Sequence, residues 1–317
     1  MFTIQQPNHI IFGKNTASEY SYPNDCLIVT SRGAKFRGWI DYINGNDFKI
    51  FDDVEPNPSM NTVEKIISLF KNENFSTIIG LGGGSSLDVA KFVGFKLKKR
   101  KIMIPTTFGS GSEVTKISVL TINGKKKSFH DKQIFADVAI IDPYFLNNCP
   151  SEILRNSAID ACAQCSEGYD SKSGNYYTQF LCKKAFNILE DAIINEKYEN
   201  LAVGSLVTGL GFGNCSTTLG HALSYVFSNE GYSHGHALAF TTTVAHNFNN
   251  SIFNKRFKKL VKKLNFDPVV LKQDIEIASE TILKDRKHLD NNPISVQKND
   301  IIELLTKINS GKIFDDI

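Results

Sequence analysis

The residues best suited to binding a metal are one carboxylate and two imidazoles in the second half of the chain, Asp160, His221 and His234. This donor set suits a divalent transition metal and leaves coordination positions open for water or substrate. The spacings of 61 and 13 residues match no short zinc signature, and single histidines are more often packing or surface residues. A glycine adjoins each histidine, as Gly220-His221 and His234-Gly235. By residue type alone, a metal centre and two ordinary histidines both remain open.

A run of glycines lies between an apolar segment and a helical pattern, within residues 78–88 (IIGLGGGSSLD). Gly82, Gly83 and Gly84 lack a Cβ, so the backbone there can approach a bound group closely. Amides at the start of the next helix carry partial positive charge that suits a pyrophosphate. The run lacks the Lys-Ser/Thr of a Walker loop and follows the third predicted strand rather than the first. It predicts a phosphate-binding turn, with a plain strand-to-helix turn as the alternative.

A second loop of hydroxyls and glycines, residues 105–113 (PTTFGSGSE), follows the next apolar segment. Small residues in two loops at the carboxyl ends of adjacent strands favour a ligand crevice. The alternative is a polar loop in which Thr107 or Ser112 caps a helix.

Elements that position these residues follow from the apolar pattern. Alternating strands and helices predict an α/β domain with a parallel sheet over residues 1–148. After Pro150 the segments are long, helix-like and almost free of proline, which predicts an all-helical domain over residues 149–317. The predicted strands are 25–31, 48–54, 76–84, 100–107 and 136–143, and the predicted helices between them are 62–72 and 87–97.

The composition excludes several classes of protein. Among 317 residues, 36 Lys and Arg oppose 33 Asp and Glu, a net charge of +3 that is too small to indicate nucleic-acid binding. No apolar stretch is long enough to span a membrane, and the N-terminus has no secretory signal. The six cysteines are scattered, which favours reduced thiols. We therefore expect a cytoplasmic protein that binds neither nucleic acid nor membrane.

Taken together, four segments resemble the iron-containing (group III) alcohol dehydrogenases. They are residues 82–91 (GGGSSLDVAK), 105–115 (PTTFGSGSEVT), 159–169 (IDACAQCSEGY) and 220–239 (GHALSYVFSNEGYSHGHALA). Residues 10–13, 54–58 and 289–293 match the same family, so the resemblance covers nearly the whole chain in order. It implies a dinucleotide-binding α/β domain and an all-helical domain, the dehydroquinate synthase-like fold, with metal and substrate in the cleft between them. Family members are commonly dimers, so a homo-oligomer is expected.

The resemblance also assigns site residues by motif position. Asp160, His221 and His234 fall on metal-ligand positions, with Gln164 at the fourth. The implied cofactor contacts are Asn57, Gly82, Gly83, Gly84, Ser85, Ser86, Asp88, Thr106, Thr107, Ser110 and Lys126 or its neighbour Lys127.

Two departures from the family pattern matter. The family motif Asp-x-x-x-His ends here in Gln164, and an amide is a much weaker ligand than an imidazole. Related glycerol dehydrogenases and dehydroquinate synthases use three protein ligands, so Zn2+ or a loosely held metal becomes more credible than tightly bound Fe2+, and a metal-free enzyme also becomes conceivable. Tyr225 replaces a histidine that lies near the nicotinamide in many members. Its hydroxyl could relay a proton, so Tyr225 and His221 are the predicted catalytic residues.

Cofactor choice is predicted from the residues after the first predicted strand. NAD-using members have an aspartate there that binds the ribose 2′-hydroxyl, whereas this chain has Ser31 followed by Arg32. A carboxylate would repel a 2′-phosphate, and a serine beside a guanidinium would accept one. The pattern favours NADP(H) over NAD(H), unless Arg32 is simply a solvated loop residue.

Lysine clusters at residues 125–127 and 96–101 (KLKKRK) favour an anionic substrate, although the second cluster fits a solvated surface run at least as well. Residues 125–128, 221–225 and 234–237 most closely resemble the phosphonoacetaldehyde reductase branch of the family. We therefore predict metal-assisted, NAD(P)H-dependent reduction of phosphonoacetaldehyde to 2-hydroxyethylphosphonate, a step of phosphonate biosynthesis. Malonic or succinic semialdehyde is the main alternative substrate.

The sequence bears on two other classes of function. A lyase resembling dehydroquinate synthase needs a dense ring of Lys, Arg and His, whereas the metal-side segments here supply mostly Ser, Asn and Tyr. A binding protein with a decayed site is suggested by Gln164 but opposed by the intact Asp160, His221 and His234.

Overall fold

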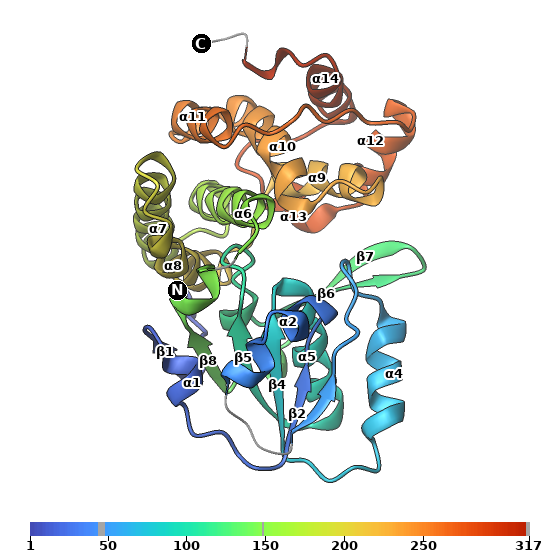
Figure 1. The fold of residues 1–317 in the computed structure, drawn as a ribbon. Helices are drawn as coiled ribbons and strands as arrows, with labels where there is room; N and C mark the ends of the chain where they lie inside the picture. Colours follow the sequence, from blue (N-terminus) through green and yellow to red (C-terminus); the bar gives the residue numbers. More distant parts are fainter. Residues whose placement is uncertain (44–47, 148, 315–317) are drawn as a thin grey trace. The chain divides into compact units, whose positions relative to one another are not determined.

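A computed structural model describes residues 1–43, 48–147 and 149–314 of the chain. It divides into two compact units, Thr3–Cys149 and Pro150–Ile317, the second joined by Met1–Phe2. We call them the α/β unit and the helical unit and describe each by itself (Figure 1).

The α/β unit is built on a six-stranded sheet in the order β1-β8-β5-β4-β2-β3, with every pair parallel. β2, β4, β5 and β8 are almost wholly buried, as expected for a parallel sheet that is covered on both faces. The strands are β1 (His9–Phe12), β2 (Cys26–Val29), β3 (Lys49–Phe51), β4 (Thr77–Gly82), β5 (Arg100–Pro105) and β8 (Val138–Ile141). The predicted parallel α/β architecture is confirmed.

Two strand features of this unit were not predicted. β1 pairs with β8 at one edge of the sheet, so the glycine run follows the fourth strand and not the third. An antiparallel hairpin, β6 (Ile117–Ile122) and β7 (Lys125–His130), lies outside the main sheet. The Lys125–Lys127 cluster lies on β7. Every residue of β7 is exposed or half-buried, so this strand is accessible to solvent.

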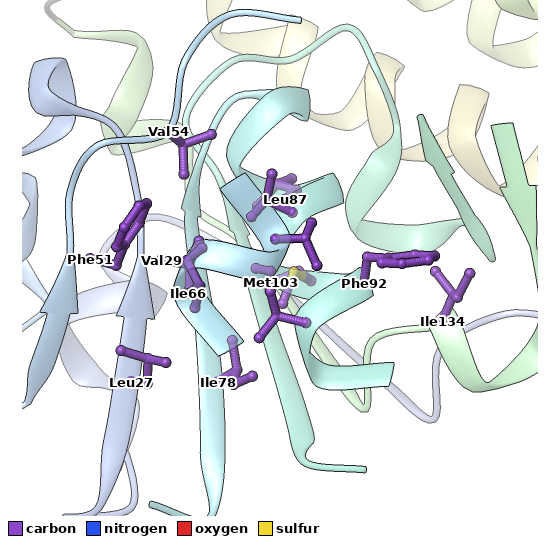
Figure 2. Close-up of a cluster of buried hydrophobic side chains, with 14 of the residues drawn as sticks. Leu27, Val29, Phe51, Val54, Ile66, Ile78, Leu87, Phe92, Met103 and Ile134 are labelled. Atoms are coloured by element: carbon purple, nitrogen blue, oxygen red, sulfur yellow. The ribbon is translucent and has the colours of Figure 1, made fainter. Parts of the chain in front are cut away.

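Helices pack on the sheet through apolar side chains that recur at helical spacing. In α4 (Met60–Phe70), Ser59 caps the N-terminus by accepting from the Thr62 amide, and Ile66 points into the core. Figure 2 shows Ile66 of α4 and Leu87 of α5 (Gly84–Leu97) beside Val29 and Ile78, which lie on strands β2 and β4 of the sheet. Burying each such side chain stabilises the fold by about 1.5–3 kcal/mol. Three shorter helices complete the unit: α1 (Thr16–Glu19), α2 (Arg32–Phe36) and α3 (Trp39–Tyr42).

The helical unit is organised around α6 (Ser151–Asp170), which packs against α7, α8 and α10. Residues 158–168 of α6 are all buried, so this helix is enclosed on every side and its polar residues must find partners inside. The other helices are α7 (Tyr176–Ile194), α8 (Leu201–Phe212), α9 (Leu219–Asn229), α10 (His234–Phe248), α11 (Asn254–Leu264), α12 (Ile275–Leu283), α13 (Arg286–Asn291) and α14 (Lys298–Asn309). In the described part of the chain, no helix combines the length and apolarity that crossing a membrane requires.

Candidate metal and cofactor sites

Three helices of the helical unit bring the predicted metal ligands together. Asp160 lies in the middle of α6, His221 in the first turn of α9, and His234 is the first residue of α10. One potential ligand atom from each lies within 4.8 Å of the other two. The two imidazole rings meet edge to face, with centroids 5.4 Å apart. Residues separated by 61 and 13 positions in the chain therefore form a compact donor cluster that fits a divalent transition metal.

Gln164 lies one turn beyond Asp160 on α6, and the two side chains are hydrogen bonded. Gln164 Nε2 donates to Asp160 Oδ1 over 2.9 Å, in the buried interior. The amide thus fixes the orientation of the carboxylate that would bind the metal. Its assignment as a fourth ligand stays a prediction.

Tyr225 follows His221 by one turn of α9, and its ring stacks nearly parallel to that of His234, at 6.3 Å between centroids. Burial raises the pKa of Tyr225 well above its ordinary value. The phenol therefore keeps its proton at neutral pH and can offer it as a hydrogen-bond donor beside the cluster.

His288 was missed by the sequence analysis, although it directly precedes the 289–293 segment that entered the resemblance. It is 4% exposed, and its ring centroid lies 6.3 Å from that of His221 and 5.7 Å from that of Tyr225. Its Nδ1 is 2.7 Å from Asp285 Oδ2. Burial lowers the pKa of His288 despite this partner, so a neutral imidazole that is oriented by a carboxylate lies next to the donor cluster.

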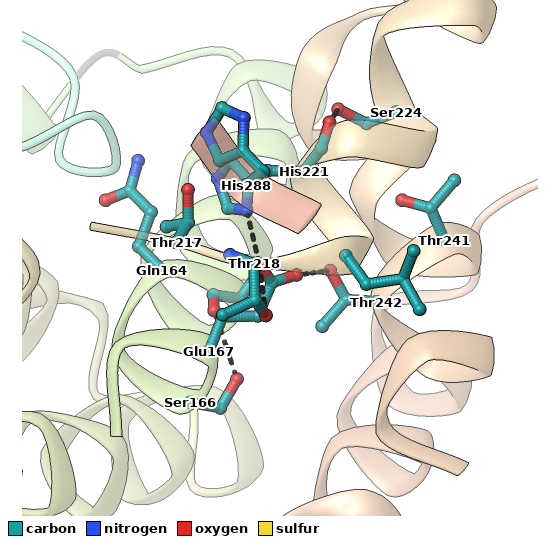
Figure 3. A network of polar contacts seen from close by, with 12 residues as sticks. Gln164, Ser166, Glu167, Thr217, Thr218, His221, Ser224, Thr241, Thr242 and His288 are labelled. Atoms are coloured by element: carbon teal, nitrogen blue, oxygen red, sulfur yellow. Dashed lines mark hydrogen bonds and ion pairs between the residues drawn. The ribbon is translucent and has the colours of Figure 1, made fainter. Parts of the chain in front are cut away.

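Glu167 was also missed. It lies two turns beyond Asp160 on α6, is 1% exposed, and contacts His221 from below in Figure 3. Burial by itself would raise the pKa of Glu167, but His221 and the Thr218 amide lower it to about 2. The group is therefore a buried carboxylate anion at neutral pH.

In the α/β unit, the glycine run forms the turn from β4 into α5. Gly82 has a φ of +151°, which side-chain-bearing residues rarely adopt, and α5 begins at Gly84 with no side-chain cap at Gly83. β2 pairs with β3 on one side and with β4 on the other. The chain therefore adds β3 to one side of β2 and the next strand, β4, to the opposite side, which makes this position a topological switch point. Thr30 Oγ1 donates to Leu81 O and ties the two carboxyl ends together. Such a switch point, with uncapped helix amides, is where α/β sheets bind phosphate groups.

The second loop packs directly against this turn. Thr106 N donates to Gly82 O over 2.9 Å. A Cβ added at Gly83 would lie 3.0 Å from Thr107 Oγ1, and one added at Gly84 would lie 3.0 Å from the Ser110 side chain. The glycines therefore admit the predicted hydroxyl residues to the phosphate turn. In contrast, the short 3-10 helix Ser112–Val114 follows Gly111 with no side-chain cap, so a loop capped by Thr107 or Ser112 is the wrong interpretation.

Asp88 acts within the fold. Its carboxylate accepts from Ser112 Oγ at 2.5 Å and from Val119 N at 2.9 Å, and pairs with the fully buried Lys91 at 3.3 Å. These contacts join α5 to the second loop and to β6. Its predicted contact with the pyrophosphate stays a prediction.

The remaining predicted cofactor residues of this unit fall into two places. Ser85 and Ser86 lie in the first turn of α5, beside the glycines. Asn57 lies next to the hairpin, because Thr121 of β6 donates from its hydroxyl to Asn57 O and pairs with Lys126 of β7. Asn57 and Lys126 are thereby brought to one neighbourhood.

Ser31 stands at the N-cap position of α2, directly after β2 and Thr30. Arg32 Nη2 lies 2.7 Å from Asp53 Oδ1, and the Arg32 side chain is 83% exposed. The guanidinium is thus neither a solitary solvated group nor buried, but is held by a surface ion pair at the end of β2. Such exposed pairs are weak, so a phosphate could replace the carboxylate.

The two lysine clusters differ in position. Lys125–Lys127 lie on the hairpin, whereas residues 96–101 span the end of α5 and the start of β5, the edge of the sheet opposite the glycine turn. In the second cluster, Lys99 Nζ donates to Phe75 O and Lys101 pairs with Asp137. Residues 96–101 therefore lie at the opposite end of the strands from the glycine turn, and their contact with an anionic substrate stays a prediction.

Comparison with known proteins agrees with this fold and donor set. The sequence model described as iron-containing alcohol dehydrogenase matches residues 7–143, and the C-terminal model of the same family matches residues 155–287. A crystal structure of an iron-containing alcohol dehydrogenase from Thermotoga maritima superposes with a TM-score of 0.89 at 25% identity, covering 98% of this chain and all of that one. The chain belongs to the iron-containing alcohol dehydrogenase family.

Curated relatives match over part of their length. The long-chain-alcohol dehydrogenase 1 of Geobacillus thermodenitrificans is 32% identical over 225 residues, which are 62% of this chain and 57% of the relative. The 4-hydroxybutyrate dehydrogenase of Clostridium kluyveri is 30% identical over 209 residues, 57% of this chain and 56% of the relative. The chain thus spans little more than half the length of these relatives.

Proposed function

We propose that this protein reduces a small anionic aldehyde to the primary alcohol with a nicotinamide cofactor and a divalent metal. The observation that carries this proposal is the convergence of Asp160, His221 and His234, with potential ligand atoms within 4.8 Å of one another. A glycine turn suited to a pyrophosphate, in a chain of the alcohol dehydrogenase family, supports the cofactor.

One carboxylate and two imidazoles suit either Zn2+ or Fe2+. Among the described residues of the helical unit, no other group of three His, Cys, Asp or Glu side chains is arranged to hold a metal ion. When bound, the metal would polarise the aldehyde oxygen and the reduced nicotinamide would supply hydride. The chain's own residues would orient the ligands and deliver a proton. Tyr225 lies one turn after His221 on α9, and the ring of His288, which Asp285 orients, lies beside Tyr225. The Tyr225 hydroxyl would donate the proton, and the His288 imidazole would relay a solvent proton back to the tyrosine.

We propose phosphonoacetaldehyde as the substrate, on the resemblance of residues 125–128, 221–225 and 234–237 to the reductases of that aldehyde. In this proposal the Lys125–Lys127 cluster would supply cations for a phosphonate. Succinic semialdehyde is the second candidate, because a relative 30% identical is a 4-hydroxybutyrate dehydrogenase and oxidation of that alcohol gives this aldehyde.

The test is the initial rate of NADPH oxidation by chelator-treated protein, before and after addition of Zn2+ or Fe2+. We expect a rate that returns only with metal, and a higher kcat/KM for phosphonoacetaldehyde than for succinic semialdehyde, because a phosphonate offers the Lys125–Lys127 cations more negative charge than a carboxylate does. The reverse order would assign the semialdehyde. Equal rates with and without metal would exclude the metal-assisted mechanism.

For the cofactor, we propose NADP(H), with Arg32 exchanging Asp53 for the 2′-phosphate. Arg32→Ala is then expected to lower kcat/KM for NADPH by about 10- to 100-fold and to leave that for NADH within about 2-fold. Ser31→Asp should reverse the preference, because a carboxylate would repel the phosphate. Lys35→Ala is the matched control, since Lys35 lies on the same helix and forms a similar ion pair with Asp52. Equal losses for both cofactors in Arg32→Ala would contradict the assignment.

A further inference from the structure

One buried carboxylate, Glu167, contacts a member of the donor cluster but does not itself belong to the cluster. Glu167 Oε2 accepts from the Thr218 amide at 2.6 Å and from Thr218 Oγ1 at 3.2 Å, and lies 3.1 Å from His221 Nδ1. Its other oxygen, Oε1, accepts from Thr242 Oγ1 at 3.2 Å. Figure 3 shows these contacts converging from α6, α9 and α10.

These contacts determine which nitrogen of His221 carries the proton. Glu167 Oε2 already accepts from the amide and the hydroxyl of Thr218, so it faces His221 Nδ1 as an acceptor, and Nδ1 is the donor. A neutral imidazole that is protonated on Nδ1 has its lone pair on Nε2. Since Nδ1 is occupied by Glu167, Nε2 is the nitrogen left to join Asp160 and His234 in the donor cluster.

The carboxylate is also held in place by its surroundings. It sits at the N-terminus of α9, where the helix dipole favours an anion, and accepts from the amide of Thr218, the residue before that helix. Gly220 makes the approach possible, because a Cβ there would lie 2.0 Å from Glu167 Oε1. Glu167 and Asp160 are seven residues apart on α6 and so share one face of the helix. One rigid helix therefore carries both a ligand and the group that orients the next ligand.

We propose that Glu167 is the positioning residue of the metal centre, which fixes His221 in the Nδ1-protonated form with Nε2 directed at the metal. The inference rests on the metal-dependent function proposed above. Carboxylates in this position raise the basicity of the imidazole as well as orienting it, and their loss lowers metal affinity about 10- to 100-fold.

The experiment combines two readouts on the whole chain, neither of which depends on aldehyde reduction. Histidine 15N chemical shifts of the metal-free protein report the tautomer of His221, assigned through His221→Ala. Competition with a chromophoric chelator gives the Zn2+ dissociation constant. In Glu167→Gln we expect the Nδ1-protonated form to lose its dominance and the Zn2+ dissociation constant to rise about 10- to 100-fold.

Asp170→Asn is the matched control. Asp170 is three residues further along α6, and its Oδ2 lies 3.6 Å from Nδ1 of His246, a buried histidine outside the donor cluster. This variant removes the charge of a second, largely buried carboxylate near an imidazole on the same helix, at a distance longer than a hydrogen bond, and should leave both readouts as in the wild type. Thr242→Val keeps the shape of its side chain and removes one contact to Glu167, so an intermediate rise in the dissociation constant is expected even if Glu167→Gln folds poorly.

The outcomes separate the two proposals. Unchanged tautomer and Zn2+ affinity in both Glu167→Gln and Thr242→Val would overturn the role of Glu167 and leave the proposed reductase intact. Tight Zn2+ binding by the wild type, weakened in Glu167→Gln, would support the role of Glu167 even if no aldehyde is reduced. A wild type that binds no divalent metal would overturn both.

Discussion

Replacing His234 with alanine should lower kcat/KM for aldehyde reduction by about 10³-fold or more and weaken Zn2+ binding in parallel. Among the described residues, the imidazole supplies one of the three donor atoms that lie within 4.8 Å of one another, so its loss leaves two of these ligands. A bound metal stabilises the developing charge on a carbonyl oxygen by several kcal/mol, and about 4 kcal/mol corresponds to 10³-fold in rate. The measurements are steady-state kinetics at saturating metal and the Zn2+ dissociation constant of each variant.

His236→Ala is the control for this prediction. His236 lies two residues further along α10, its Nε2 is 2.6 Å from the Asp267 carbonyl oxygen, and it is not a member of the donor cluster. We expect near-normal kcat/KM and Zn2+ affinity for this variant. Comparable losses in His234→Ala and His236→Ala would show that damage to α10, and not loss of a ligand, explains the effect.

The α/β architecture could be predicted because its signals are local. Apolar runs such as residues 76–84 and 100–107 became β4 and β5, and the helical spacing at 87–97 became most of α5. β1 escaped prediction because it is a short edge strand with partly exposed residues. The β6–β7 hairpin did too, because its lysines resemble a solvated loop more than a strand.

The donor cluster and the residues that support it could be predicted only in part, because the supporting residues bind no metal themselves. Asp160, His221 and His234 are ligand types, so a resemblance to a metal-dependent family drew attention to them. Glu167 and His288 act through other side chains. The role of Glu167 depends on its contact with His221, which lies 54 residues further along the chain, and the role of His288 depends on the packing of its ring beside that of His221. For Glu167 a usable signal did exist, since a carboxylate seven residues after Asp160 lies on the same face of a helix.

The glycines beside the two histidines illustrate the same limit. The sequence showed that Gly220 precedes His221 and that Gly235 follows His234, but offered no reason for them. In the structure, a Cβ at Gly220 would lie 2.0 Å from Glu167 Oε1, and one at Gly235 would lie 2.0 Å from the backbone oxygen of Asn156 on α6. Both glycines therefore let α9 and α10 approach α6 closely enough to bring the ligands together.

Gly220→Ala should accordingly destabilise the helical unit by about 3 kcal/mol or more, seen as a fall in Tm of about 10 °C. The new methyl group would also lie 2.7 Å from Thr242 Oγ1 and 2.9 Å from its Cα, so α10 cannot yield without a backbone shift. Displacing Glu167 would leave a buried carboxylate short of donors, which adds about 1–3 kcal/mol. The same displacement should weaken Zn2+ binding, so the variant is expected to lose stability and metal affinity together.

Gly204→Ala on α8 separates this effect from ordinary crowding in a buried helix. Its Cβ would lie 2.6 Å from Cδ2 and 2.8 Å from Cγ of Leu189, and these side-chain atoms can move by a change of rotamer without a backbone shift. We therefore expect a loss of about 1 kcal/mol or less and unchanged Zn2+ affinity, because alanine also favours the helix by about 1 kcal/mol over glycine. Thermal unfolding and chelator competition on the two variants provide the measurement. If Gly220→Ala is as stable as Gly204→Ala and binds Zn2+ as tightly as the wild type, the close approach of Glu167 to α9 cannot be what holds His221 in place.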